Sequence, residues 1–245
     1  MTRKQYFSSG LKDGMPICFG YFAVSFAFGI QAAGIGLSVF EASVLSALNV
    51  TSAGQFAALA IIASGASLIE LAFTQLIINL RYFLMSCALS QKLSPSLPLG
   101  HRLGIAYGMT DEIFAVSVSQ REPLSPFYSY GLIAVAILGW VLGTALGAAA
   151  GNILPAVLTN ALGIAIYGMF IAIILPPAKE NRVVAGVVVL SMVLSALFTY
   201  LPVLCNISSG FRIIVITLIT AGGAALLFPI PDEPAEPEKE MPHEG

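Results

Sequence analysis

The sequence predicts an all-α protein, a polytopic transmembrane helical bundle of six to eight spans with at least one broken or re-entrant helix. Of its 245 residues, 57% are hydrophobic and only 10% are charged, whereas charged residues make up about 25% of ordinary soluble domains. The mean hydropathy is +0.88, and apolar runs of about 20 residues, the length that crosses a bilayer as a helix, recur along the chain. A soluble globule needs more polar surface than this composition supplies.

Eight apolar segments follow one another, at about 14–34, 42–64, 66–90, 104–120, 128–151, 156–176, 183–201 and 212–229. The first lacks a convincing small-residue cleavage site, so we expect a retained span rather than a signal peptide. The second is interrupted by the polar and small residues 49–55, which a lipid-facing helix would avoid. It is therefore predicted to break or re-enter beside protein or water. The fourth is too short to cross comfortably.

The predicted organisation has three regions: a cytoplasmic N-terminal segment at 1–13, a transmembrane transport domain at 14–229, and a disordered, acidic, proline-rich tail at 230–245. If segments two and four re-enter, six segments cross and the basic loop residues gather inside. The positive-inside rule prefers that version. Eight crossings stay open because segment two is long enough to cross. Both versions place both termini in the cytoplasm.

The fifth segment carries glycine at every fourth position, at Gly139, Gly143, Gly147 and Gly151. Such spacing lets two helices approach closely and gain dispersion contacts. The partner helix can belong to this chain, or the ladder can be a docking face for another subunit.

Candidate site residues gather in the first half of the chain, while the last four segments contain no carboxylate and are predicted to be scaffold. The candidates for substrate binding or proton coupling are Asn49, Gln55, Glu70, Asn79, Arg81, Asp111 and Glu112. An ionisable group deep in a bilayer costs about 2.5–3.5 kcal/mol on insertion scales. Arg81 is too far from the end of its segment to snorkel, so it needs an anionic partner: Glu70, Asp111, Glu112 or a substrate carboxylate. A structural ion pair, a transport site and an edge position in a misjudged span all remain open for Arg81.

Enzymatic functions find no support in the sequence. The nucleotide-binding motif GxxxxGK[ST], the zinc motif HExxH and the nucleophile motif GxSxG are all missing, and each carries the residues that its chemistry requires. The two histidines and three cysteines have no metal-site spacing. We therefore expect no catalytic residues, no metal, no cofactor and no nucleic-acid partner.

Three sequence blocks resemble the AzlC family, the large subunit of bacterial branched-chain amino acid exporters. They are Thr51-Ser52-Ala53-Gly54-Gln55-Phe56, Asn79-Leu80-Arg81-Tyr82 and Thr110-Asp111-Glu112-Ile113-Phe114-Ala115. The resemblance implies secondary export of leucine, isoleucine and valine, with methionine as a further candidate, and a small, four-span AzlD-type membrane partner. One departure lies at Leu162-Gly163-Ile164-Ala165, where some relatives carry a carboxylate.

The resulting hypothesis is a proton-linked secondary exporter in the bacterial cell membrane, working by alternating access. A zwitterionic amino acid needs a cationic contact, an anionic contact and an apolar pocket. Arg81, or half-helix N-termini near 49–55, would hold the carboxylate. Asp111, Glu112 or Glu70 would hold the ammonium group or exchange the proton. The alternatives are an accessory or assembly subunit without its own substrate site, and a passive channel.

Overall fold

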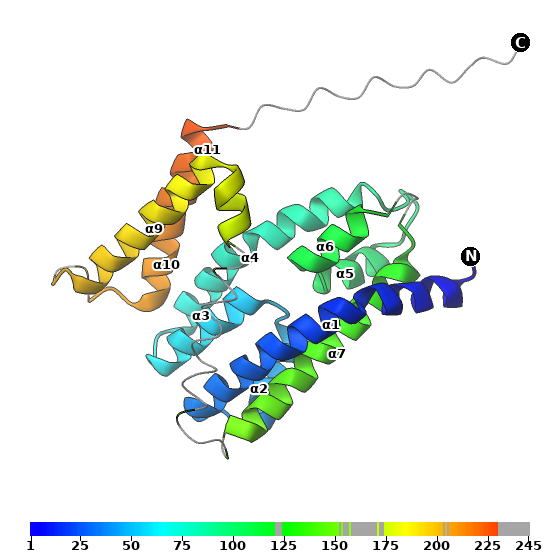
Figure 1. The fold of residues 1–245 in the computed structure, drawn as a ribbon, viewed down its shortest axis with the longest axis horizontal. Coiled ribbons are helices and arrows are strands. Elements are labelled where there is room, and N and C mark those ends of the chain that lie inside the picture. The colour runs from blue at the N-terminus through cyan, green and yellow to red at the C-terminus, as the bar shows by residue number, and fades with distance from the viewer. Residues whose placement is uncertain are drawn as a thin grey trace, which may run out of the picture.

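The computed structural model describes residues 1–120, 124–151, 153, 157, 171, 174–202, 204 and 206–229. Within these ranges the chain is helical and contains no strand, as the sequence predicts (Figure 1). The helices are α1 (Arg3–Gly34), α2 (Val39–Leu48), α3 (Ser52–Ala63), α4 (Leu68–Ser90), α5 (Leu99–Tyr107), α6 (Asp111–Val118), α7 (Pro126–Gly151), α9 (Arg182–Tyr200), α10 (Ser209–Thr217), a π-helical turn η1 (Leu218–Gly222) and α11 (Gly223–Leu227).

Helices α1 and α7 run side by side in the same direction and form the scaffold of the described structure (Figure 1). Glycine on both helices makes their close approach possible. A Cβ on Gly147 would lie 2.0 Å from the Phe26 carbonyl oxygen, and one on Gly10 would lie 2.1 Å from that of Tyr128. The glycine ladder of α7 therefore faces α1. It is an internal helix contact, the first of the two alternatives that its spacing left open.

Helices α2 and α3 form a hairpin of two half-helices in place of one continuous helix. Midway into the protein, Gln55 of α3 donates a hydrogen bond of 3.0 Å to the Ser46 hydroxyl of α2. Nearer the surface, Leu59 of α3 packs in one cluster with Ala42 of α2. The chain thus enters along α2 and returns along α3. The break is shorter than the predicted 49–55, because Ser52 already begins α3.

Helices α5 and α6 repeat this arrangement from the opposite end of the scaffold. Gly104 of α5 and Gly108, which caps its C-terminus, lie successively further along α7, against Tyr130 and Ile133. The chain then returns along α6, and the Lys92 amine at the end of α4 binds the carbonyl of Val118. The predicted short segment 104–120 is therefore two half-helices. The first begins at Leu99, earlier than the apolar run suggests, because His101 and Arg102 lie in its polar first turn.

Five helical stretches of the described chain are long and apolar enough to cross a membrane: α1, α4, α7, α9 and Ser209–Leu227. Neither hairpin belongs to this group, which favours the six-crossing version of the topology. The predicted segment 156–176 lies largely outside the described residues, and the predicted tail 230–245 lies wholly outside them. Most of 1–13 forms the first turns of α1.

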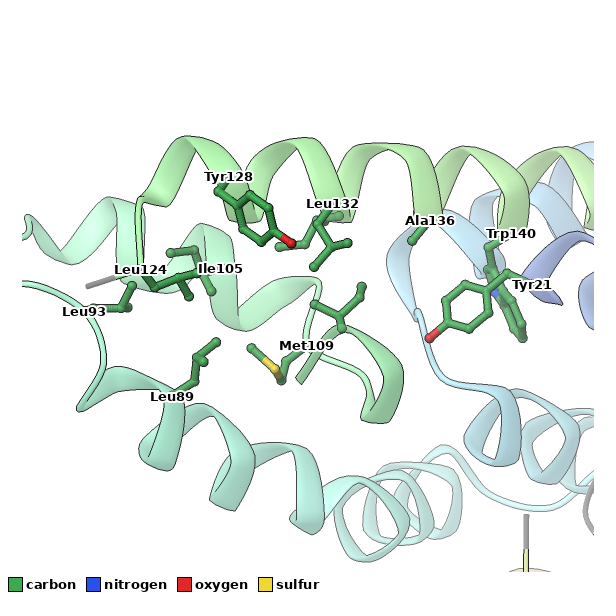
Figure 2. Packing of buried hydrophobic residues seen from close by; sticks show 12 residues of the cluster. Tyr21, Leu89, Leu93, Ile105, Met109, Leu124, Tyr128, Leu132, Ala136 and Trp140 are labelled. Carbon is green, nitrogen blue, oxygen red and sulfur yellow. The ribbon is translucent and has the colours of Figure 1, made fainter. Parts of the chain in front are cut away.

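The main core lies where α6 and α5 fill the space between α1, α4 and α7 (Figure 2). Ile113, Leu132 and Trp140 are each at most 2% exposed there. Tyr21 of α1 meets Trp140 of α7 edge to face, with ring centroids 5.2 Å apart. Burial of these large side chains fixes the position of α6, and with it the position of Asp111 and Glu112 at the α6 N-terminus.

Candidate functional site

The N-termini of α3 and α6 open onto one pocket of about 360 Å³. One part of its lining, polar except for Ala53, comes from the caps and first residues of the two half-helices and from α4: Thr51, Ser52, Ala53, Thr110, Asp111, Glu112, Arg81 and Tyr82. Its remaining lining, mostly apolar, comes from Tyr21, Val50, Ile77, Ile78, Trp140, Ile174 and Thr217. The two hairpins, entering from opposite ends, thus meet at a single cavity.

Each half-helix begins with a threonine cap. The Thr51 hydroxyl accepts the N–H of Gly54 and the Thr110 hydroxyl accepts the N–H of Ile113, each at 3.4 Å. The other amides of a helical first turn have no partner within the helix, and the helix dipole places partial positive charge there. Two such ends facing one cavity favour an anionic group in it.

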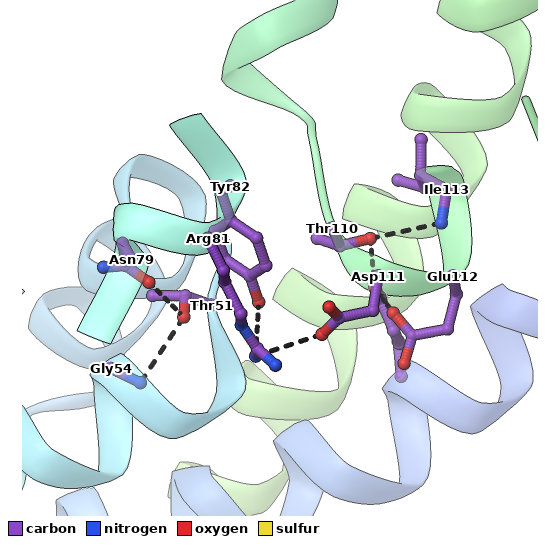
Figure 3. A network of polar contacts seen from close by, with 10 residues as sticks. Thr51, Gly54, Asn79, Arg81, Tyr82, Thr110, Asp111, Glu112 and Ile113 are labelled. Carbon is purple, nitrogen blue, oxygen red and sulfur yellow. Dashed lines mark hydrogen bonds and ion pairs between the residues drawn. The ribbon is translucent and has the colours of Figure 1, made fainter. Parts of the chain in front are cut away.

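Arg81 of α4 forms an ion pair with Asp111 of α6, with 3.0 Å between Nη2 and Oδ2 (Figure 3). The side chains are 44% and 40% exposed, because both line the cavity. The guanidinium also lies over the Tyr82 ring, 4.9 Å from its centroid. Of the anionic partners predicted for Arg81, the structure brings Asp111 to it. The pair joins α4 to the second hairpin.

Glu112 has different partners, although it is adjacent to Asp111 in the chain. The Tyr21 hydroxyl donates a hydrogen bond of 2.5 Å to Glu112 Oε2 and lies 2.6 Å from the Thr110 hydroxyl. Asp111 is thus matched by a cation and Glu112 by a neutral donor. The two carboxylates are in different environments within one pocket, which is the arrangement in which adjacent acids take separate roles.

Asn49 and Asn79 brace the break between α2 and α3 and do not line the pocket. Asn79 Oδ1 accepts the Thr51 hydroxyl at 2.8 Å, and Asn79 Nδ2 donates to Gln75 Oε1 at 3.2 Å. Asn49 donates to the same Gln75 oxygen at 3.3 Å, while Gln75 Nε2 donates to the Gly54 carbonyl at 2.7 Å. The network ties α4 to both sides of the break, so these residues position the pocket wall.

Gln55 and Glu70 lie outside the pocket as well. Gln55 is fully buried and accepts the Trp140 indole N–H at 2.7 Å, so it holds a wall residue in place. Glu70 lies near the start of α4, where its Oε1 accepts the Gly210 amide at 2.8 Å and the Ser208 hydroxyl at 2.5 Å. Of the seven predicted residues, the structure brings three together at the cavity: Arg81, Asp111 and Glu112.

Several lining residues escaped the sequence analysis. Tyr21 and Trp140 stand in apolar runs where an aromatic side chain carries no signal of a site, whereas Tyr82 belongs to the second of the three sequence blocks. Thr51 and Thr110 could have been recognised as helix starts, because a threonine directly before a helical run is a typical N-cap. Gln75, which braces the break and does not line the pocket, lies four positions before Asn79, the spacing of side chains that share a helix face.

Comparison with known proteins identifies the family. The model of the AzlC protein family matches residues 16–154, which includes all three sequence blocks and more than half of the chain. An uncharacterized membrane protein of Archaeoglobus fulgidus is 35% identical over 189 residues, covering 76% of this chain and 83% of its own. The inner membrane protein YgaZ of Escherichia coli K12 is 31% identical over 184 residues, covering 72% and 75%. No solved structure matches. The chain belongs to the AzlC family of membrane proteins.

Proposed function

We propose that this protein is a secondary exporter of branched-chain amino acids and that the pocket between the two hairpins is its substrate site. One observation carries the proposal: a single cavity combines two half-helix N-termini, one arginine, two carboxylates and a largely aliphatic and aromatic wall. A zwitterion with an aliphatic side chain needs each of these elements. An enzymatic role has no comparable support.

The substrate carboxylate would bind at the first turn of α3, where Ser52 and Ala53 line the cavity, and beside Arg81. The ammonium group would face Asp111. Binding would then exchange one ion pair for two, since the substrate inserts a negative and a positive charge between Arg81 and Asp111. Such an exchange conserves charge balance in a place where an unpaired charge is costly. Ile77, Ile78 and Ile174 would contact the aliphatic side chain.

Proton coupling would use Glu112. The pocket holds two adjacent carboxylates and one arginine, so one carboxylate lacks a cationic partner among the lining residues. Glu112 accepts a hydrogen bond from the Tyr21 hydroxyl, which also lies 2.6 Å from the Thr110 hydroxyl. These two hydroxyl groups can reorient when the carboxyl group gains or loses its proton. Alternating access would expose that carboxyl group to each side of the membrane in turn.

The membrane setting of the proposal is the bacterial plasma membrane, with a small AzlD-type subunit as partner. Helix α9 supports the partner, because all of its residues except Phe198 are at least partly exposed in the described chain. Lipid alone would also cover such a face. The experiment below therefore compares uptake with and without the small subunit.

Uptake of labelled leucine into inside-out membrane vesicles tests the proposal, with and without a proton gradient and with and without the small subunit. Arg81→Lys keeps the charge but loses the bidentate fork, and Asp111→Asn and Glu112→Gln keep the shape without the charge. We expect each to lower uptake by about tenfold or more, the scale of one lost charged contact of roughly 1.4 kcal/mol. Glu41→Gln, at an exposed carboxylate outside the pocket, is the matched control.

Normal insertion of all three variants with wild-type uptake and pH dependence would make these residues structural. Uptake that neither saturates nor responds to a proton gradient would indicate a passive channel. Leucine transport by the small subunit alone would leave this chain an accessory role. Each of these results contradicts the proposal.

A further inference from the structure

A second cavity, of about 430 Å³, lies between α9 and the stretch formed by η1 and α11. It runs from Arg182 and Phe228 at one end to Leu190 and Ile219 at the other. Because Arg182 and Phe228 share an end, the two helical stretches are antiparallel neighbours (Figure 1). The cavity shares no lining residue with the central pocket, so the proposed substrate site leaves it unused.

This cavity is an apolar groove with space left by glycine on both walls. A Cβ on Gly186 of α9 or on Gly223 of α11 would meet no atom within 4 Å. Besides Arg182, the polar side chain in the lining is Thr220, whose hydroxyl already donates to the Ile216 carbonyl of its own helix at 2.7 Å. An occupant of the groove therefore has to be apolar along most of its length.

Arg182 sets the depth of the groove in the membrane. It is the first residue of α9, which is long and apolar enough to cross a membrane and carries no other charge. The charged end of such a helix lies at the level of the lipid headgroups. From Arg182 to Leu190 the helix advances about 12 Å, and half of a hydrocarbon core of about 30 Å is about 15 Å. The groove therefore follows most of one leaflet.

The mouth of the groove offers a cation for an anionic group. The Arg182 side chain is exposed and makes no ion pair or hydrogen bond within the described part of the chain. Its guanidinium presents paired N–H donors that match phosphate oxygens. The α9 dipole adds partial positive charge, but the Asn181 side chain already accepts the Val183 and Val184 amides. Arg182 is therefore the group that would contact an anion.

We propose that this groove binds one membrane glycerophospholipid, with its phosphate at Arg182 and one acyl chain along Gly186 and Gly223. Charge and length both support this occupant. A phosphate meets a guanidinium at headgroup level, and a chain of the same leaflet follows an apolar groove about 12 Å long. A soluble anion has no chain for the groove, and a diacylglycerol has no phosphate for Arg182. The contact uses the phosphate that all these lipids share.

The bound lipid would support the wall between the groove and the central pocket. Thr217, the last residue of α10, lines the pocket, whereas Ile219 and Thr220 of η1 line the groove. Turns of π-helix inside α-helices occur frequently at functional sites. The assignment itself depends on the groove and on Arg182, and it stands independently of the proposed substrate.

Native mass spectrometry of the full-length protein, purified in detergent and depleted of lipid, tests the proposal. The protein is titrated with dioleoyl phosphatidylethanolamine, with dioleoylglycerol, which has the same chains and no phosphate, and with glycerol phosphate, which has no chains. We expect one tightly retained phospholipid per chain and no bound glycerol phosphate. Dioleoylglycerol should be retained about tenfold more weakly, the scale of one lost charged contact.

Two variants separate the phosphate contact from the chain contact. Arg182→Gln should weaken retention of the phospholipid by about tenfold and leave that of dioleoylglycerol unchanged. Gly186→Leu should weaken retention of both lipids, because its side chain would enter the open groove. Lys179→Gln is the control for charge, since Lys179 is exposed near the same helix end and does not line the groove. Gly20→Leu, at an exposed glycine of α1 with equally open surroundings, is the control for bulk.

Several results, each obtained on protein that elutes as folded in size-exclusion chromatography, would overturn the assignment. Equal retention of phospholipid and dioleoylglycerol would remove the phosphate contact, and bound glycerol phosphate would indicate a site for soluble anions. Wild-type retention in Arg182→Gln or Gly186→Leu, or an equal loss in either control, would place the lipid elsewhere. Because the assay contains no amino acid, its outcome is separable from failure of the proposed leucine transport.

Discussion

At the scale of single residues, most of the polar groups inside this membrane protein satisfy one another, and a few are left for a ligand. Gln55, Asn49 and Asn79 each donate or accept bonds that hold helices together. The contacts of Arg81 and Asp111, by contrast, can be exchanged, because both side chains line a cavity. This division separates positioning residues from the residues proposed to bind substrate.

Trp140→Phe should destabilise the protein while keeping an aromatic ring in the core. The change removes the indole N–H and leaves the buried Gln55 Oε1 without its donor, which costs about 1–3 kcal/mol. Thermal unfolding in detergent should show a lower midpoint. In a Gln55→Leu background the same substitution should cost much less, because the oxygen is already gone. Equal costs in both backgrounds would show that lost packing, not the hydrogen bond, explains the effect.

At the scale of elements, the sequence predicted some helices well and others poorly, for physical reasons. The break after α2 was predictable because polar residues at mid-segment cannot face lipid. The start of α5 at Leu99 was not predictable. Pro98 precedes it, and the polar side chains of His101 and Arg102 interrupt the apolar pattern just after it. The partners of Glu70 could not be predicted either, because they are 138 and 140 residues away along the chain. No local sequence pattern indicates such distant contacts.

The glycine ladder makes a prediction with a control on another helix. Gly147→Leu should prevent α7 from approaching α1, because any Cβ there would collide with the Phe26 backbone. Overpacking costs about 1–3 kcal/mol where side chains can adjust, and backbone cannot easily do so. Gly186→Leu on α9 meets open space and should be tolerated. Size-exclusion chromatography of both variants compares their folded fractions, and equal yields would contradict the internal contact.

The first turn of α3 should be accessible to water on one side only. In a background without the native cysteines, Ser52→Cys and Ala53→Cys should react with a water-soluble thiol reagent, since both positions line the pocket. Gly54→Cys and Gln55→Cys should be protected, because both positions are buried. Excess leucine should slow labelling at the two reactive positions if the pocket is the substrate site. Uniform protection across all four would argue against a water-filled cavity.

At the scale of the whole molecule, the two hairpins divide the described chain into opposite ends. One end gathers the N-terminus of α1, the end of α4, and the outer ends of α5 and α6. Basic residues concentrate there: Arg3, Lys4, Lys12, Lys92 and Arg102. Helix α10 begins beside Glu70 at the other end, so its continuation through α11 runs back toward the basic end.

This arrangement predicts the membrane topology. Because cytoplasmic loops are enriched in lysine and arginine, the basic end should face the cytoplasm, with both chain termini on that side. Single cysteines at Ser38 and Ser64, at the two outer ends of the first hairpin, should react with an impermeant thiol reagent added outside intact cells. Cysteines at Ser94 and Ser119 should react only after the cells are opened, because the second hairpin enters from the cytoplasm. Reporter fusions at both termini provide the independent control. Labelling of Ser38 and Ser64 from opposite sides would mean that α2 and α3 cross the membrane, and the re-entrant fold would be wrong.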